Sequence, residues 1–174
     1  ANTYHLFLQP GLKTISKARG LKHFMVWRKF ILTDSGGFQV MSLSKIRRIT
    51  DEGVEFRSYI DGSKHFFSPE KVVEIQEEFG SDIAMTLDVC LPYPSSFEEN
   101  ERSVDLTIEW AKRSLEAKKR KDQILFAIIQ GGTFLELRLL CLEKLENIGF
   151  PGYGIGSLSV GEPKELTWQI IEEL

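Results

Sequence analysis

The chain has 174 residues, of which 42% are hydrophobic and 27% are charged. This composition excludes a disordered or fibrous protein and predicts a soluble globular piece that can bury a core. The formal net charge of −3 excludes a uniformly basic nucleic-acid-binding surface. The apolar runs are much shorter than the roughly 20 residues that a membrane span requires, so we expect a cytoplasmic protein without membrane contact.

The first predicted strand, 30–33, leads directly into a carboxylate and a double-glycine turn. Glycines lack Cβ, so the backbone can adopt positive φ and its amides can approach a flat ligand closely. An aromatic side chain follows and can stack on that ligand. Taken alone, the motif is explained equally well by a plain strand-to-helix turn with a solvated aspartate. Its members are Asp34, Ser35, Gly36, Gly37 and Phe38.

Two basic stretches follow along the chain. Lys45, Arg47 and Arg48 come shortly after the glycine turn, and we expect them to contact phosphate because they lie close to the proposed site. The second stretch, 112–121, is predicted to end a helix that carries acidic residues in its earlier turns. Its charge order suits a solvated helix face.

The elements between residues 54 and 80 are a hairpin and a helix. Residues 54–59 alternate between apolar and polar types and are separated from 64–67 by an Asp-Gly pair, which predicts a β-hairpin with a tight turn. A helix is predicted to begin after Ser68 as N-cap, with Pro69 at its first position, and to close at Gly80.

Strands alternate with helices through the rest of the chain, which predicts parallel βαβ units. Together with 30–33 they form an α/β arrangement in a single domain, 1–174, to which the N-terminal stretch can add another strand. Trp27, Trp110 and Trp168 are expected in the core. The further strands are 83–87, 124–129 and 153–158, and the further helices are 98–121, 134–147 and one from about 162 onward.

Polar residues follow these strands at the ends where parallel sheets bind ligands, so we expect them to converge on one pocket. Asp88 ends an apolar run, and its two oxygens match a ring N–H and an exocyclic amine, the donors on the Watson-Crick edge of guanine. Gln130 can donate to the guanine carbonyl, as can the backbone amides of the glycine-rich segment 154–158. An N-cap or ion-pair role for Asp88 and a surface position for Gln130 stay open as alternatives.

Long motifs in this chain resemble those of the tRNA-guanine transglycosylase family, also called queuine tRNA-ribosyltransferase. The resemblance covers nearly the whole sequence and implies a (β/α)8 barrel, of which 174 residues supply only an incomplete portion because a closed barrel needs about 250. It also implies exchange of guanine at the tRNA wobble position for a deazaguanine, in queuosine biosynthesis. The motifs are 2–6, 33–40, 81–94, 130–131 and 156–162.

The resemblance also implies a role for each pocket residue. Asp34 matches the family's acid/base residue, residues 35–38 match the pocket wall, and Asp88 and Gln130 match the residues that read the base edge. Ser157 stands where the family usually has glycine, which costs about 1 kcal/mol if φ is positive there, and Leu158 follows in register. Cys90 and Val160 match the bacterial form, which takes an aminomethyl-deazaguanine.

Other parts of the family's machinery are expected outside this chain. The resemblance implies a second aspartate as nucleophile and a cysteine-rich zinc site beyond Leu174, so the chain as given is expected to lack both. Cys90 and Cys141 have no metal-binding spacing and are predicted to be buried thiols. The resemblance further implies tRNA, guanine and the deazaguanine as partners, and a homodimer. Two alternatives remain, a non-catalytic tRNA-binding partner subunit of the same family and an unrelated barrel glycosidase.

Overall fold

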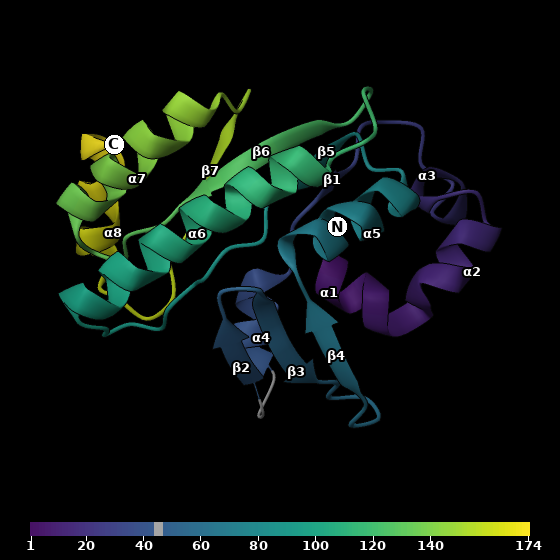
Figure 1. Ribbon diagram of the computed structural model, residues 1–174, viewed down its shortest axis with the longest axis horizontal. Helices are drawn as coiled ribbons and strands as arrows, with labels where there is room; N and C mark the ends of the chain where they lie inside the picture. The colour runs from purple at the N-terminus through teal and green to yellow at the C-terminus, as the bar shows by residue number, and fades with distance from the viewer. Residues whose placement is uncertain (44–46) are drawn as a thin grey trace.

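The computed structural model describes residues 1–43 and 47–174, and Lys45 lies outside them. Helices and strands follow one another along the described chain, and the strands form a parallel and an antiparallel sheet (Figure 1). Within the described residues no helix is both long and apolar enough to cross a membrane. The helices are α1 Thr3–Leu6, η1 Phe7–Gly11, α2 Leu12–Lys17, α3 Leu21–Phe24, α4 Gly37–Leu43, α5 Pro69–Phe79, α6 Phe97–Ala117, α7 Leu135–Ile148 and α8 Lys164–Glu173. The strands are β1 Leu32–Thr33, β2 Arg47–Thr50, β3 Gly53–Arg57, β4 Lys64–Phe67, β5 Ile83–Met85, β6 Ile124–Ile129 and β7 Tyr153–Ile155.

The larger sheet is parallel and has the order β1-β5-β6-β7, which confirms the predicted α/β class and βαβ units. Three strands are shorter than predicted. The run 30–33 pairs only from Leu32, and Phe30 is 83% exposed. β5 ends at Met85 and β7 at Ile155, because the residues after them leave the ladder to form the loops of the pocket.

Helices α5, α6 and α7 pack on one face of this sheet (Figure 1). Leu125, Ala127 and Ile129 of β6 belong to the core cluster shared with α6 and α7, as strand alternation requires. Met85 and Ile128 do not belong to it and line the pocket described below. The sheet therefore presents one face to the helices and the other to the site.

The smaller sheet is antiparallel, with the order β2-β3-β4. It confirms the hairpin, but the connection is the loop 58–63 and not the predicted tight turn, because Asp61 and Ser58 hold a wider loop through their side chains. Arg47 and Arg48 of the basic stretch belong to β2, a strand that the sequence did not predict. Val54, Phe56 and Phe67 form the buried face of this sheet.

Helix boundaries follow local capping chemistry. α5 begins after Ser68, whose hydroxyl accepts from the Lys71 amide, and ends at Gly80 in the left-handed conformation, as predicted. α6 has a capping box between Ser96 and Glu99. It ends at Ala117, earlier than the predicted residue 121, because the next residue adopts an extended backbone conformation.

The N-terminus does not form the additional strand. Asn2 makes one isolated parallel bridge with Asp34, and helix α1 begins at the next residue. The prediction of three core tryptophans was right for Trp110, which is fully buried, and wrong for Trp27 and Trp168, which are 48% and 60% exposed.

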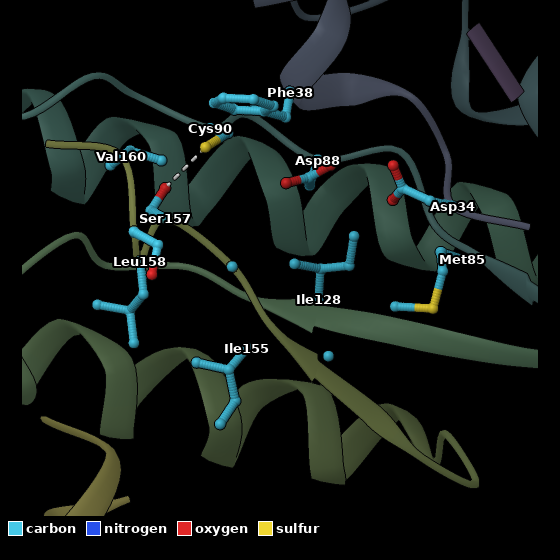
Figure 2. Close-up of a pocket in the computed structure, with 13 residues that line it drawn as sticks. Asp34, Phe38, Met85, Asp88, Cys90, Ile128, Ile155, Ser157, Leu158 and Val160 are labelled. Carbon is cyan, nitrogen blue, oxygen red and sulfur yellow. Dashed lines mark hydrogen bonds between the residues drawn. The ribbon is translucent and has the colours of Figure 1, made fainter. Parts of the chain in front are cut away.

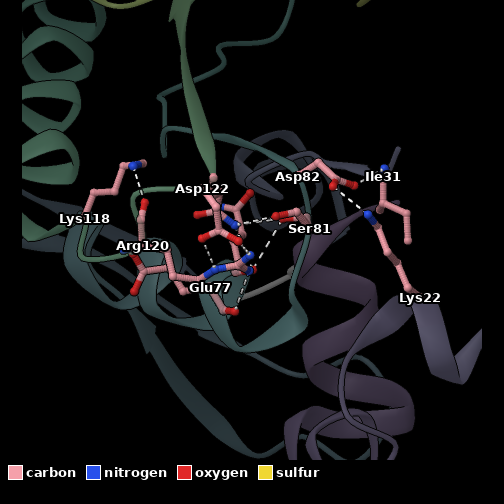
Figure 3. A network of polar contacts seen from close by, with 10 residues as sticks. Lys22, Ile31, Glu77, Ser81, Asp82, Lys118, Arg120 and Asp122 are labelled. Carbon is pink, nitrogen blue, oxygen red and sulfur yellow. Dashed lines mark hydrogen bonds and ion pairs between the residues drawn. The ribbon is translucent and has the colours of Figure 1, made fainter. Parts of the chain in front are cut away.

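A polar network ties the elements together at the amino ends of β5 and β6 (Figure 3). Asp82 accepts from Lys22 Nζ at 2.6 Å and from the Ile31 amide at 2.8 Å. Arg120 pairs with Asp122 at 2.6 Å. These contacts lie at the opposite strand ends from the pocket, so we assign them to stability.

Candidate functional site

A pocket of about 270 Å³ lies at the carboxyl ends of the parallel strands. Its walls come from the segments that follow β1, β5 and β7, together with Met85 of β5 and Ile128 of β6. Figure 2 shows the two carboxylates of Asp34 and Asp88 at this pocket, with Cys90 and Ser157 on its other side. The predicted convergence of strand ends is therefore confirmed for the segments after β1, β5 and β7, whereas 130–132 does not line the pocket and reaches the site only through the bond from Gln130 to Asp88.

Asp34 is held by the N-terminal residues. Asn2 Nδ2 donates to Asp34 Oδ2 at 2.7 Å and also to Gln39 Oε1 at 2.8 Å. The Thr3 amide donates to the Asp34 carbonyl at 2.9 Å. Burial raises the pKa of Asp34 above its ordinary value, although the amides of Ser35 and Gly36 and the Asn2 side chain oppose this shift. A carboxyl group with a raised pKa is suited to accept and return a proton.

Asp88 is almost fully buried, with 4% of its surface exposed. Gln130 Nε2 donates to Asp88 Oδ2 at 2.6 Å, and Ser35 Oγ donates to Asp88 Oδ1 at 3.2 Å. Burial raises the pKa of Asp88 to about 7, and the negative charge of Asp34 adds to this effect. The two carboxyl groups are therefore electrostatically coupled, and Asp88 changes charge near neutral pH.

Gly36 and Gly37 stand where the backbone passes too close to other residues to leave room for a side chain. A Cβ at Gly37 would collide with Asp88 Oδ1, and one at Gly36, whose φ is +89°, would lie 2.6 Å from Tyr4 Cβ. Ser35 is buried behind the carboxylate, whereas Phe38 lines the pocket and is 42% exposed. Phe38 is thus available to cover the face of a planar ligand.

The segment after β7 forms the opposite wall. Ser157 has a φ of +47°, so a residue with a side chain occupies the left-handed region here, which is the case in which we expected serine to be unfavourable. Ser157 Oγ donates to Cys90 Sγ at 3.3 Å, and burial raises the pKa of the Cys90 thiol to about 11. Leu158 and Val160 also line the pocket. Both carboxylate oxygens of Glu162 accept backbone amides of this segment, from Ser159 and from Val160.

The predicted site residues divide into two groups. Asp34, Phe38, Asp88, Ser157 and Leu158 line the pocket. The others support that lining, because Ser35 and Gln130 bond to Asp88, and Gly36 and Gly37 allow the chain to pass close to Tyr4 and Asp88. The alternative surface position for Gln130 is wrong, since its side chain is fully buried.

Of the three predicted phosphate-binding residues, only Arg48 has a side chain that the structure describes, and Lys45 lies outside the described residues. Arg48 is on β2 opposite Glu55 of β3 and borders a separate surface pocket of about 530 Å³ on the antiparallel sheet. The side chain of Arg47 is not described. Arg48 is not among the residues that line the pocket at the carboxyl ends of the parallel strands.

Sequence reasoning missed several residues that the structure brings to the site. Met85 and Ile128 line the pocket from strand interiors, and only their alternation with core-facing neighbours could have indicated this. Asn2 and Gln39 lay inside the recognised motifs but received no role. Arg138 is fully buried behind the wall formed by 156–158. Among the described residues, no group of three or more histidine, cysteine or acidic side chains could hold a metal ion.

Comparison with known proteins decides the family. The family model described as Queuine tRNA-ribosyltransferase matches residues 1–174, the whole of this chain. The chain belongs to that family. The queuine tRNA-ribosyltransferase of Caldanaerobacter subterraneus subsp. tengcongensis is 61% identical over 172 residues, which are 98% of this chain and 46% of the relative.

Other queuine tRNA-ribosyltransferases agree. The protein of Thermoanaerobacter pseudethanolicus is 56% identical over 99% of this chain and 46% of its own length. That of Moorella thermoacetica is 56% identical over 100% of this chain and 47% of its own length. The chain thus spans slightly under half the length of these curated relatives.

Proposed function

We propose that the full-length protein is a tRNA-guanine transglycosylase, which exchanges guanine at the anticodon wobble position for an aminomethyl-deazaguanine. The observation that carries this proposal is the buried Asp88 carboxylate, bonded by Gln130 and coupled to Asp34 at the end of a parallel sheet. Membership of the queuine tRNA-ribosyltransferase family supports it.

Base recognition follows from the donors and acceptors at Asp88. An ionised carboxylate is an acceptor only, and guanine presents a ring N–H and an amine on one edge. Pairing the two would supply the buried carboxylate with the donors that its burial demands. Phe38 would then cover one face of the purine, and Cys90 and Val160, which line the pocket, would face the substituent of the deazaguanine.

Proton management is the proposed role of Asp34. The departing guanine needs a proton and the arriving base must lose one, and a carboxyl group with a raised pKa can do both in turn. Asn2 holds the carboxylate in place for this task. Exchange with retention at the ribose also needs a carboxylate nucleophile that forms a covalent ribosyl-enzyme. That this nucleophile lies outside the 174 residues stays a prediction.

Recognition of tRNA is proposed for the basic stretch Lys45, Arg47 and Arg48. Arg48 belongs to the antiparallel sheet, where its register partner on β3 is Glu55. Phosphate contacts supply most of the affinity for nucleic acid. We therefore expect this stretch to add to tRNA binding without affecting the choice of base.

A (β/α)8 barrel is the proposed architecture of the whole enzyme, with 1–174 as one part of its catalytic domain. The packing of α5, α6 and α7 on a single face of the parallel sheet supports it, because a doubly wound sheet is covered on both faces. Zinc bound outside these residues, a homodimer and a cytoplasmic location stay predictions.

The decisive test measures incorporation of radiolabelled guanine into tRNA by the full-length protein. We expect incorporation with wild-type protein and none with Asp34→Ala. A glycosidase would release sugar and bind no guanine, and a non-catalytic partner subunit would bind tRNA without exchange. Either result would contradict the proposal.

A further inference from the structure

Arg138 is a buried cation for which the sequence predicted no role and to which the proposed chemistry gives none. It lies in the first turns of α7 and has none of its surface exposed. Burial lowers its pKa to about 10, so the guanidinium stays charged at neutral pH. A buried charge is costly unless it makes specific hydrogen bonds, so its contacts point to a task.

Those contacts join the loops after two neighbouring strands. Arg138 Nε donates to the Gly132 carbonyl at 2.7 Å, in the loop after β6. Arg138 Nη2 donates to the carbonyls of Gly156 and Ser157, at 2.8 Å and 3.2 Å, in the loop after β7. Nη1 has no hydrogen-bond partner among the described protein atoms.

The direction of these carbonyls fixes the direction of two amides. In a trans peptide the C=O and the N–H of the following residue point in opposite directions. Because the oxygens of Gly156 and Ser157 point to Arg138, the amides of Ser157 and Leu158 point away from it. On the side away from Arg138 lies Cys90, which lines the pocket and whose pKa the Ser157 backbone lowers against the larger effect of burial.

This segment needs such support because its backbone is strained. Ser157 and Ser159 have φ of +47° and +60°, which is unfavourable for residues with a side chain. Conformations of this kind persist only where surrounding contacts determine them. Arg138 holds the segment through its carbonyls, while Glu162 holds it through the amides of Ser159 and Val160.

We propose that Arg138 is a positioning residue for base selection, which turns the amides of Ser157 and Leu158 toward the carbonyl oxygen of the bound base. The inference rests on the proposed function, since it assumes that guanine or its deaza analogue occupies the pocket. Arg138 would thereby favour a base that has a ring carbonyl. It would do so through the two backbone amides and without contacting the base itself.

The test compares guanine with thioguanine, in which sulfur replaces the ring carbonyl oxygen while the donors that face Asp88 are retained. Binding of both ligands to the full-length protein is measured by calorimetry for wild type, Arg138→Lys and Arg138→Met. Lysine keeps the charge but cannot span the carbonyls of both loops, and methionine removes charge and donors. Arg113→Lys is the matched control, because Arg113 also bonds backbone carbonyls, those of Asp51 and Glu52, away from the pocket.

We expect wild type and Arg113→Lys to prefer guanine. Both Arg138 variants should bind guanine about tenfold or more weakly and thioguanine within about threefold of wild type, because only the carbonyl contact is lost. Equal weakening of both ligands would make Arg138 merely structural and overturn the inference, as would unchanged binding of both. Failure of wild type to bind guanine would instead overturn the proposed function itself.

A second measurement needs no variant. Hydrogen exchange of the amides at 157–158 is followed in wild-type protein with guanine and with thioguanine. Stronger protection by guanine is expected, because those amides would donate to its oxygen. Equal exchange rates with both ligands would overturn the inference even if the Arg138 variants did not fold.

Discussion

Gln130 and Asp88, the two residues proposed to read the edge of the base, are bonded directly to one another, with Gln130 Nε2 at 2.6 Å from Asp88 Oδ2. Gln130 Oε1 is buried and has no hydrogen-bond partner among the described residues. The amide is thereby fixed beside the carboxylate, and a Cβ on Gly156 would lie 2.5 Å from Gln130 Nε2. Under the proposed function, an entering base would therefore meet an ordered pair and would not have to order two free side chains.

Asp88→Asn should remove most guanine affinity of the full-length protein. One acceptor becomes a donor that faces a donor of the base, which costs about 1–3 kcal/mol or roughly tenfold or more in Kd. Calorimetry measures the effect. Asp82→Asn is the matched control, because Asp82 lies just before the opposite end of β5, in the network of Figure 3, and should leave guanine affinity unchanged. Unchanged binding in Asp88→Asn would refute the edge-reading role.

Guanine affinity should depend on pH around neutrality. The pKa of Asp88 is about 7 in the free pocket, and donors from the base would lower it by favouring the charged carboxylate. Binding then releases a proton below that pKa, so affinity should fall about tenfold from about pH 8 to about pH 6. Asp88→Asn should show no such dependence. A flat wild-type profile would contradict the shifted pKa.

The ionisation of Asp88 should affect the stability of the fold in the opposite direction, so that stability rises as the pH falls whereas guanine affinity falls. Because folding raises the pKa of Asp88 from its ordinary 3.8 to about 7, the native state favours the protonated form, so stability falls as the pH rises between these two values and the loss is complete above about pH 7. Asp88→Asn should therefore raise the melting temperature at about pH 8, with a smaller gain as the pH falls. Ser35 Oγ can accept from the new amide. Asp82→Asn should instead lower the melting temperature. Despite the opposing effect of burial, Lys22 and the Ile31 amide hold the pKa of Asp82 below its usual value, so its charged form stabilises the fold.

Asp34→Ala should abolish guanine exchange while tRNA binding is largely retained. Phosphate contacts dominate the affinity for tRNA, and Asp34 is not among them. Turnover is followed with labelled guanine and tRNA binding by filter retention. Asp61→Ala is the control that should change neither quantity, because Asp61 lies in the loop 58–63 between β3 and β4 and does not line the pocket. Parallel loss of tRNA affinity and turnover would make Asp34 a structural residue.

Arg48→Ala should weaken tRNA binding without changing guanine affinity. Loss of one phosphate contact reduces the slope of log K against log salt by about 1. Combined replacement of Lys45, Arg47 and Arg48 should enlarge this effect. Lys112→Ala, an exposed change on α6, is the matched control. An unchanged salt slope in the triple variant would remove this stretch from the tRNA interface.

The sequence by itself determined those features that a few neighbouring residues encode. Ser68, Pro69 and Gly80 fixed the ends of α5 because caps act on amides and carbonyls within one turn. Strand and helix alternation fixed the parallel sheet, and the turn after Thr33 fixed the position of Asp34. Periodicity did not predict β2, or the ends of β5 and β7, because neighbouring segments decide where pairing stops.

Only the tertiary structure decided how the site is assembled. The contacts of Gln130 with Asp88, Asn2 with Asp34 and Arg138 with Gly156 join residues that are 42, 32 and 18 positions apart. Burial of these groups sets the raised pKa values of Asp34 and Asp88, and burial is a property of the packed chain. The sequence identifies the candidate site residues, whereas packing brings them together and sets their charge.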